Sequence, residues 1–254
     1  MSLEAVRAWI VGASSGIGAA LARELADRGA RVAISARRRP LLDEVAGDRM
    51  IVEPCDVTSL DSVHASADTV TQALGGLDLV VVAAGISRPI DARRFDATTV
   101  ATVMTVNVIG TANVIEATLP QLLAQGSGTF SAIASVAGYR GIPGLEAYGA
   151  SKAAQISMLE SLRTSVRGSG VDVVTICPGW VESEMSASVT NRTLVMSAAE
   201  AASTIADGLE SGRVEIVFPL PIAIAAKLSR LVPQRMWSAA WHKDRRRYAG
   251  PPSL

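Results

Sequence analysis

The sequence predicts a doubly wound α/β fold, in which helices cover both faces of one parallel sheet of about seven strands. Short apolar stretches alternate with amphipathic stretches of helical length along the chain. Hydrophobic residues make up 49% of the chain and aromatic residues only 4%, as is typical of parallel strands built from Val, Ile, Leu and Ala. A glycine-rich turn follows the first strand, as in folds that bind ligands at the carboxyl edge of the sheet.

Each expected strand is a short run rich in Val, Ile, Leu or Ala, bounded by glycine, proline or polar residues. The run LDLVVVAAG is continuous and apolar but too short for a helix, which indicates a strand buried on both faces. In chain order, strands are expected at 6–12, 31–35, 49–55, 77–85, 128–135, 171–179 and 213–218.

Each expected helix lies between two of these strands and carries apolar residues at helical spacing. The first ends at a glycine, and Thr58 or Ser59 is suited to cap the third. The helices are expected at 16–29, 39–46, 59–75, 97–124, 146–168 and 197–212. Because neither a linker nor a repeat divides the chain, we expect one domain: a main part, 1–218, and a C-terminal helical extension, 219–254.

The composition excludes several classes of function. Basic and acidic residues number 24 each, so the net charge of zero gives no basic field for nucleic acid. Cys55 and Cys177 form neither a disulfide nor a metal-ligand pattern, and we expect buried thiols and no metal site. The N-terminus enters a strand almost directly, without a charged-then-apolar leader, so the expected location is the cytoplasm.

The first turn, VGASSGIG, predicts a dinucleotide site. It carries Gly12, Gly16 and Gly18, with Ser14, Ser15 and Ile17 between them. Glycines let the backbone approach a pyrophosphate, whose charge is then stabilised by the helix N-terminus. The spacing GxxxGxG is a weak signal alone, and its position at the first turn of an alternating fold strengthens it.

The end of the second strand indicates which dinucleotide binds. A carboxylate there would bind the ribose hydroxyls of NAD and repel a 2′-phosphate. This chain has Ala36 at that position, followed by Arg37, Arg38 and Arg39. Because a guanidinium pairs well with phosphate, we expect Arg37, supported by Arg38, to select NADP(H), and Arg39 to be solvated.

Tyr148 and Lys152 in AYGASK lie four residues apart, so on a helix they share one face. A phenol has a pKa of about 10, and a neighbouring ammonium lowers it, which would make the tyrosine a general acid/base. Ser135 ends the preceding strand and could hold a substrate oxygen. Asn107 is a polar residue in an apolar helical stretch, so its side-chain amide needs hydrogen-bond partners there, either at a helix kink or in a functional site.

Taken together, these motifs resemble the short-chain dehydrogenase/reductase family over about residues 6–218. The resemblance implies a Rossmann-type fold, a nicotinamide cofactor and a catalytic tetrad of Asn107, Ser135, Tyr148 and Lys152. Tyr148 would exchange the proton, Lys152 would hold the nicotinamide ribose and lower the pKa of Tyr148, Ser135 would orient the carbonyl, and Asn107 would anchor a relay water. Cofactor contacts are further implied for Asp56, Val57, Ala84, Gly85, Pro178, Gly179, Val181 and Ser183.

Two departures from the family pattern stand out. The usual NNAG after the fourth strand is VAAG at 82–85, which removes bracing asparagine contacts but keeps the close approach at Ala84 and Gly85. The usual threonine near 183 is Ser183, which keeps the hydroxyl. No catalytic group is lost by either change.

Three functions stay open from the sequence. The first is an NADP(H)-dependent reductase acting on a carbonyl, and the second an alcohol dehydrogenase of the same family working in the oxidising direction. The third is a dinucleotide-binding regulator without useful turnover, which the intact Ser135, Tyr148 and Lys152 disfavour.

Two surfaces predict further contacts. The apolar faces of helices 97–124 and 146–168 favour a homodimer or homotetramer, since related enzymes pair these helices. The extension carries a nearly continuous apolar run at 222–231, then Trp237 and Trp241, then a basic run at 243–247. It is too short to span a bilayer, and it would either pack beside the cleft or a partner subunit, or lie on a membrane. Each placement favours an apolar substrate.

Overall fold

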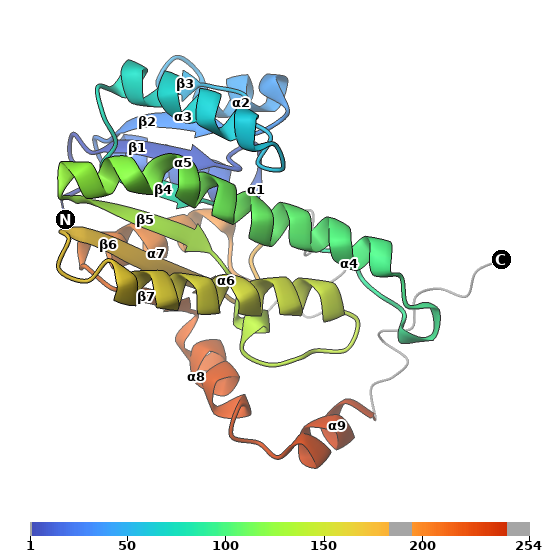
Figure 1. The fold of residues 1–254 in the computed structure, drawn as a ribbon. Helices are drawn as coiled ribbons and strands as arrows, with labels where there is room; N and C mark the ends of the chain where they lie inside the picture. Colours follow the sequence, from blue (N-terminus) through green and yellow to red (C-terminus); the bar gives the residue numbers. More distant parts are fainter. Residues whose placement is uncertain (1, 183–194, 243–254) are drawn as a thin grey trace.

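The computed structural model describes residues 2–182 and 195–242, and its strands form one seven-stranded parallel sheet in the order β3-β2-β1-β4-β5-β6-β7 (Figure 1). The strands are β1 (Arg7–Val11), β2 (Arg31–Ser35), β3 (Ile51–Val52), β4 (Leu79–Val82), β5 (Gly128–Ile133), β6 (Val171–Pro178) and β7 (Glu215–Phe218). The predicted fold class is confirmed. β1 pairs with both β2 and β4, so the strand order reverses beside β1. Such a switch point is where doubly wound sheets bind ligands.

Helices cover both faces of the sheet (Figure 1). They are α1 (Gly16–Asp27), α2 (Arg39–Ala46), α3 (Leu60–Leu74), α4 (Ala97–Met104), α5 (Gly110–Gln125), α6 (Glu146–Ser165) and α7 (Ala198–Glu210), followed by α8 (Leu220–Ser229) and α9 (Gln234–His242). Ser59 caps α3 as predicted, because its hydroxyl accepts a hydrogen bond from the Ser62 amide.

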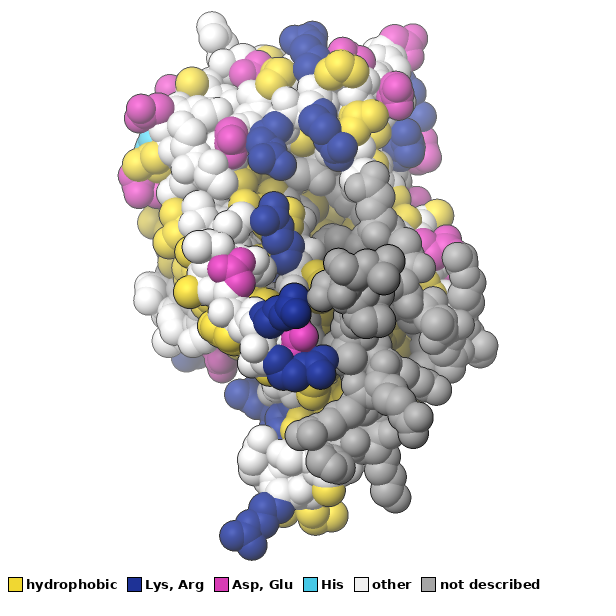
Figure 2. Space-filling model, turned by 90° about the vertical axis from the view of Figure 1, so that its right-hand side faces the viewer, with side chains coloured by type: hydrophobic (Ala, Val, Ile, Leu, Met, Phe, Trp, Pro, Cys, Tyr) yellow, Lys and Arg dark blue, Asp and Glu magenta, His cyan; other side chains and the backbone are white. Residues whose placement is uncertain are grey.

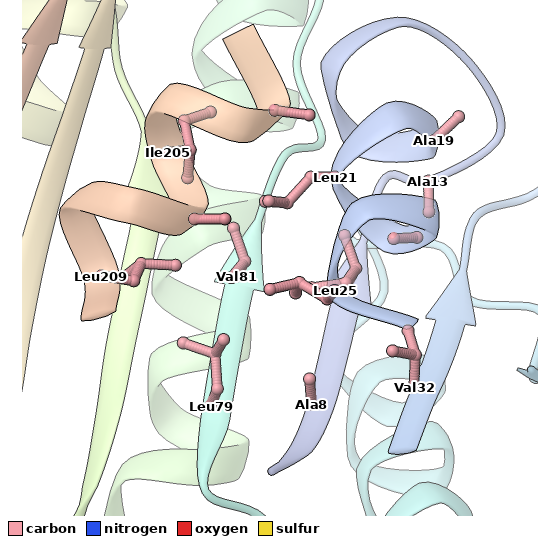
Figure 3. Close-up of a cluster of buried hydrophobic side chains, with 14 of the residues drawn as sticks. Ala8, Ala13, Ala19, Leu21, Leu25, Val32, Leu79, Val81, Ile205 and Leu209 are labelled. Carbon is pink, nitrogen blue, oxygen red and sulfur yellow. The ribbon is translucent and has the colours of Figure 1, made fainter. Parts of the chain in front are cut away.

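Two apolar cores form, one on each face of the sheet. On one face Leu21 and Leu25 of α1 meet Ile205 and Leu209 of α7 above Val81 of β4 (Figure 3). On the other face α3, α5 and α6 cover a core whose largest side chains are fully buried and include Trp9, Leu74, Leu122, Phe130 and Leu159. The sheet is therefore buried on both sides, as its continuous apolar strands predict.

The helix expected at 97–124 differs from the prediction in its centre. α4 and α5 are joined by a π-helical turn over Thr105–Ile109, which contains Asn107. A π turn inserts one residue into a helix and often lies at a functional site. The expected strand 49–55 is also shorter, since at the sheet edge only Ile51 and Val52 pair with β2.

Candidate active site

The turn between β1 and α1 lets the backbone that follows β4 approach closely. Gly12 has a φ of +95°, and a Cβ there would lie 2.3 Å from the Ala84 nitrogen. A Cβ on Gly18 would lie 2.4 Å from the Gly12 carbonyl oxygen. Only glycine fits at both positions, so the turn is narrow and its backbone is accessible to a ligand.

The N-terminus of α1 suits an anion. Ser15 precedes the helix, Gly16 begins it with a φ of +57°, and its first turn, which includes Ile17, holds no acidic residue. The first amides of a helix have no partner within the helix and carry partial positive charge. The turn residues Ser14, Ser15 and Gly16 also border an open hollow of about 470 Å³, which Arg23, Glu44 and Glu182 line as well. These features fit the pyrophosphate of a dinucleotide.

Two arginines flank this turn. The Arg38 guanidinium lies 3.5 Å from the Ser14 hydroxyl. Arg37 acts on the other side, because its charge contributes to lowering the pKa of Asp56. Both side chains are exposed. Two guanidinium groups therefore border the end of β2, where the sequence has no acid.

Asp56 and Val57 lie between β3 and α3. The Asp56 carboxylate accepts hydrogen bonds from the Thr58 amide at 2.9 Å and the Thr58 hydroxyl at 2.8 Å, and these contacts hold its pKa below the usual value. The Val57 carbonyl accepts a hydrogen bond from Asn113 of α5 at 2.8 Å. The Asp56 loop is thus fixed between α3 and α5 at the same edge as the glycine turn.

Ala84 and Gly85 follow β4. The Ala84 amide donates to the Val11 carbonyl at 2.9 Å, so this segment remains attached to β1. A Cβ on Gly85 would lie 3.4 Å from both Asn107 Oδ1 and Lys152 Nζ. The glycine therefore leads the chain directly past two of the predicted catalytic residues.

Ser135 and Tyr148 come together across the edge of the sheet. Ser135 follows β5, is buried, and accepts a hydrogen bond from the Ala137 amide at 3.1 Å. Its hydroxyl also lies near the Tyr148 phenol and contributes to lowering the pKa of that phenol. Burial is the larger influence and raises the Tyr148 pKa. The two hydroxyls can address the same substrate oxygen.

Lys152 lies one turn after Tyr148 and its ammonium is 5.6 Å from the centre of the tyrosine ring. Its side chain is buried, and burial lowers its pKa to about 7. The nitrogen donates to the Ile133 carbonyl at 2.7 Å and to Gln155 Oε1 at 2.8 Å. The sequence predicts that Lys152 lowers the pKa of Tyr148. In the structure that pKa is instead raised, because burial outweighs the other influences on the phenol and the ammonium is bound to other acceptors.

Asn107 braces the site from within the π turn. Its side chain accepts from the Ile86 amide at 2.8 Å and donates to the Ile86 carbonyl at 3.0 Å and to Ser151 at 2.9 Å. Its backbone carbonyl accepts from the Thr111 hydroxyl and the Gln155 amide. The structure thus gives these groups protein partners, where the family resemblance implies an anchored water.

The segment after β6 borders the candidate site on the side of Ser135. Pro178 is buried and its carbonyl oxygen lies 3.4 Å from the Ser135 hydroxyl. The Gly179 amide donates to the Phe218 carbonyl at 2.7 Å, and Val181 forms a parallel bridge with Met196. Ser183, the last predicted cofactor contact, lies outside the described residues.

All described candidates lie at the carboxyl ends of the strands. The strands run from left to right in Figure 1, so these ends face the side that Figure 2 shows, where Lys and Arg side chains form a column. A narrow glycine turn, an open helix N-terminus and basic side chains fit a dinucleotide, and the paired hydroxyls with a lysine fit acid/base chemistry.

Sequence reasoning missed Gln155 and Ser151. Gln155 is fully buried and contacts both Lys152 and Asn107, while the Ser151 hydroxyl links Asn107 to the Tyr148 carbonyl. The signal was available for Gln155, since a polar residue three positions after Lys152 shares its helix face.

Known proteins with similar sequences and structures indicate the family of this chain. The family model for short chain dehydrogenase matches residues 7–193. An uncharacterized oxidoreductase of Myxococcus xanthus is 37% identical over 242 residues, which cover 92% of this chain and 95% of the relative.

Two solved structures share the fold. A short chain dehydrogenase from Burkholderia cenocepacia in complex with NADP has a TM-score of 0.83 at 27% identity, with 99% of this chain and 100% of that chain covered. A short chain dehydrogenase/reductase from Burkholderia phymatum in complex with NAD has a TM-score of 0.82 at 24% identity, with both chains covered completely at 100%. The chain therefore belongs to the short-chain dehydrogenase/reductase family and has the Rossmann-like fold of an oxidoreductase that binds a nicotinamide dinucleotide.

Proposed function

We propose that this chain reduces a carbonyl group on an apolar substrate with NADP(H), in the cytoplasm. The observation that carries the proposal is geometric: the Tyr148 phenol lies beside the Ser135 hydroxyl, and the Lys152 ammonium is 5.6 Å from the centre of its ring. A phenol, with a pKa of about 10, is protonated at neutral pH. It is then in the form that gives a proton to a carbonyl oxygen.

Each residue has a distinct role in that reaction. The dinucleotide supplies the hydride when bound. Ser135 donates a hydrogen bond to the carbonyl oxygen and orients it, while Tyr148 protonates the oxygen as negative charge develops. Lys152 lies one turn away on the same face and binds the nicotinamide ribose. Asn107 holds Ile86, and with it the segment after β4, against α6 through Ser151.

The preference for NADP(H) rests on the end of β2. Arg38 lies at Ser14 of the glycine turn, and Arg37 acts on Asp56, so the two guanidinium groups flank the region where the adenosine ribose would lie. Two exposed cations without an acid at this position favour a 2′-phosphate. Solved relatives bind NADP in one case and NAD in another, so the chain's own arginines carry this part of the proposal.

A panel of aldehydes and ketones of increasing chain length tests the reaction, with NADPH and NADH consumption followed by absorbance. We expect turnover with NADPH, and Tyr148→Phe should lower kcat about 10²–10⁴-fold with little change in cofactor affinity. The matched control is Tyr139→Phe, which removes a phenol hydroxyl bonded to Glu215 and should leave kcat near the wild-type value. Turnover of Tyr148→Phe equal to that of Tyr139→Phe would overturn the mechanism.

The apolar substrate is favoured by the C-terminal extension. The Arg140 guanidinium donates to the Val232 carbonyl at 3.0 Å and stacks on Trp237, whose indole donates to the Gly141 carbonyl at 2.8 Å. The extension is thereby fastened to the segment between Ser135 and Tyr148. Apolar side chains accordingly lie close to the chain that borders the substrate site.

One face of α8 remains uncovered in the described chain. Leu220, Ile224 and Leu228 recur every four residues and are 69%, 51% and 56% exposed. Such a stripe suits a membrane surface. The predicted basic run at 243–247 lies outside the described residues.

Liposome co-sedimentation of the whole chain with neutral and anionic vesicles tests this contact. Replacement of Leu220, Ile224 and Leu228 by serine should abolish sedimentation with vesicles. Equal sedimentation of the two proteins would exclude α8 as the contact.

We also propose a homo-oligomer formed through α4, α5 and α6. The helix at Ala97–Gln125 is strongly apolar, yet only 28% of its most apolar stretch is buried. A shallow apolar hollow between α5 and α6 is lined by Ile115, Met158 and Leu162. A second copy placed on a two-fold axis would cover both helices. Sedimentation equilibrium should show a dimer or tetramer, and Met158→Glu should shift it towards monomer.

A further inference from the structure

Gln155 is a buried amide at the centre of the candidate site. It lies on α6 three residues after Lys152, and its side chain is fully buried. A buried amide is costly unless its donors and acceptor are bound. Its partners therefore show what the residue is for.

Every polar group of Gln155 is bound to the site. Its Oε1 accepts a hydrogen bond from Lys152 Nζ at 2.8 Å. Its Nε2 donates to the Asn107 carbonyl at 2.9 Å and to the Thr111 hydroxyl at 2.7 Å. Thr111 is itself fully buried and donates to the same carbonyl at 2.7 Å. One side chain thus connects the catalytic lysine to the π turn.

Few other groups in the described chain fix the position of the Lys152 ammonium. An ammonium has three hydrogens, and within the described chain two of them are bound by protein oxygens, Ile133 O and Gln155 Oε1. The titratable groups that act on it are the Tyr148 ring of its own helix and the Cys177 thiol of β6. Gln155 is therefore one of two acceptors that orient the nitrogen, and the one supplied by a side chain.

We propose that Gln155 is a positioning residue: it fixes the Lys152 ammonium in place and ties it to the π turn at Asn107. The inference rests on the proposed function for its effect on turnover, and on the geometry alone for its effect on Lys152. The side-chain amide of Gln155 bridges the Lys152 ammonium and the Asn107 carbonyl by direct hydrogen bonds. Since an amide does not gain or lose protons near neutral pH, Gln155 orients the lysine and passes no proton through it.

Two substitutions separate the parts of this arrangement. Gln155→Leu removes both ends of the amide at similar size. The buried ammonium then loses a hydrogen-bond acceptor, and the pKa of Lys152 should fall by about one unit. Gln155→Glu keeps an oxygen toward Lys152 and adds a negative charge, so the same pKa should rise by about one unit or more.

The pKa of Lys152 can be read directly, without turnover. The chain has three lysines, Lys152, Lys227 and Lys243. Lysine labelled with ¹³C at Cε therefore gives few NMR signals, and Lys227→Arg and Lys243→Arg assign that of Lys152. Titration of the whole chain then gives its pKa in the wild type and in both Gln155 variants.

The control is Gln121→Leu, which removes an amide that bonds Thr71 far from the site and should leave the Lys152 titration unchanged. Opposite shifts in Gln155→Leu and Gln155→Glu support the proposal. Lys152 titrating as in the wild type in both would overturn it. If Gln155→Leu does not fold, Thr111→Val replaces it, since that variant frees one amide hydrogen of Gln155 and should shift the Lys152 pKa in the same direction by less.

Turnover gives a second, separable result. If the chain is a reductase, Gln155→Leu should lower kcat by about 10- to 100-fold through misplacement of Lys152, with a smaller change in KM. Its pH profile should move together with the Lys152 pKa. Absence of turnover in the wild type would count against the proposed function, while the NMR titration would still decide the role of Gln155.

Discussion

Gly12→Ala should destabilise the chain and close the dinucleotide site at once. Two costs add at this position. With a φ of +95° a Cβ is strained, which costs about 1–2 kcal/mol. The Cβ would also lie 2.3 Å from the Ala84 nitrogen and 2.5 Å from its Cα. Because both are backbone atoms, they cannot rotate away, and relief requires displacement of the segment after β4 at about 1–3 kcal/mol.

The sum is about 2–5 kcal/mol, which for a chain of this size lowers Tm by about 4–20 °C. Gly75→Ala is the matched control, since Gly75 has a φ of +76° but nothing within 4 Å of its Cβ position. It should cost only the conformational part, about 1–2 kcal/mol. Thermal and urea unfolding measure both variants, and dinucleotide binding should weaken in Gly12→Ala alone. Equal losses of stability in the two would refute the steric reasoning.

Three further predictions follow from charged groups. The double variant Arg37→Ala, Arg38→Ala should bind NADP(H) about 10- to 100-fold more weakly, because charge-assisted contacts of about 1.5–3 kcal/mol are lost. Its affinity for NAD(H) should stay nearly unchanged. Calorimetric titration that showed equal losses of affinity for the two dinucleotides would contradict this. The pKa of Lys152 is lowered to about 7 when folded, so between pH 7 and 9 only the unfolded chain binds that proton. Stability should therefore rise by about 2–3 kcal/mol over this range, and Lys152→Met should remove the rise in urea unfolding. Arg140→Ala removes the contacts that fasten Val232 and Trp237, so proteolysis should release the extension sooner; an unchanged cleavage rate would show that other contacts hold it.

The fold could be predicted because its signal is repeated along the chain. Each strand is an apolar run and each helix an amphipathic one, so small local errors leave the topology intact. The ends of the individual strands and helices were less predictable. β3 is reduced to Ile51–Val52 because it lies at the sheet edge and pairs only with β2, while the sequence favours a strand over 49–55. The π turn at Thr105–Ile109 leaves no clear trace, since it differs from an α-helix by one extra residue.

The positions of the candidate catalytic residues could be predicted, but the direction of their pKa shifts could not. Spacing places Tyr148 and Lys152 on one face, and the structure agrees. The pKa of each depends on burial and on groups far away in sequence. Burial raises that of Tyr148 above its usual value, and Lys152 donates to Ile133 and Gln155. Such contacts join α6 to β5 and the π turn, so no local motif contains them.

These shifts together bear on the balance between the acid and base forms of Tyr148. Carbonyl reduction uses the protonated phenol, whereas alcohol oxidation uses a base at the same oxygen. A phenolate would form more readily beside a charged lysine, yet burial lowers the pKa of Lys152 to about 7. Gln155 opposes that loss of charge by accepting a hydrogen bond from the ammonium. The balance between burial and the two acceptors of the ammonium, the Ile133 carbonyl and Gln155, therefore sets how much positive charge lies beside the phenol.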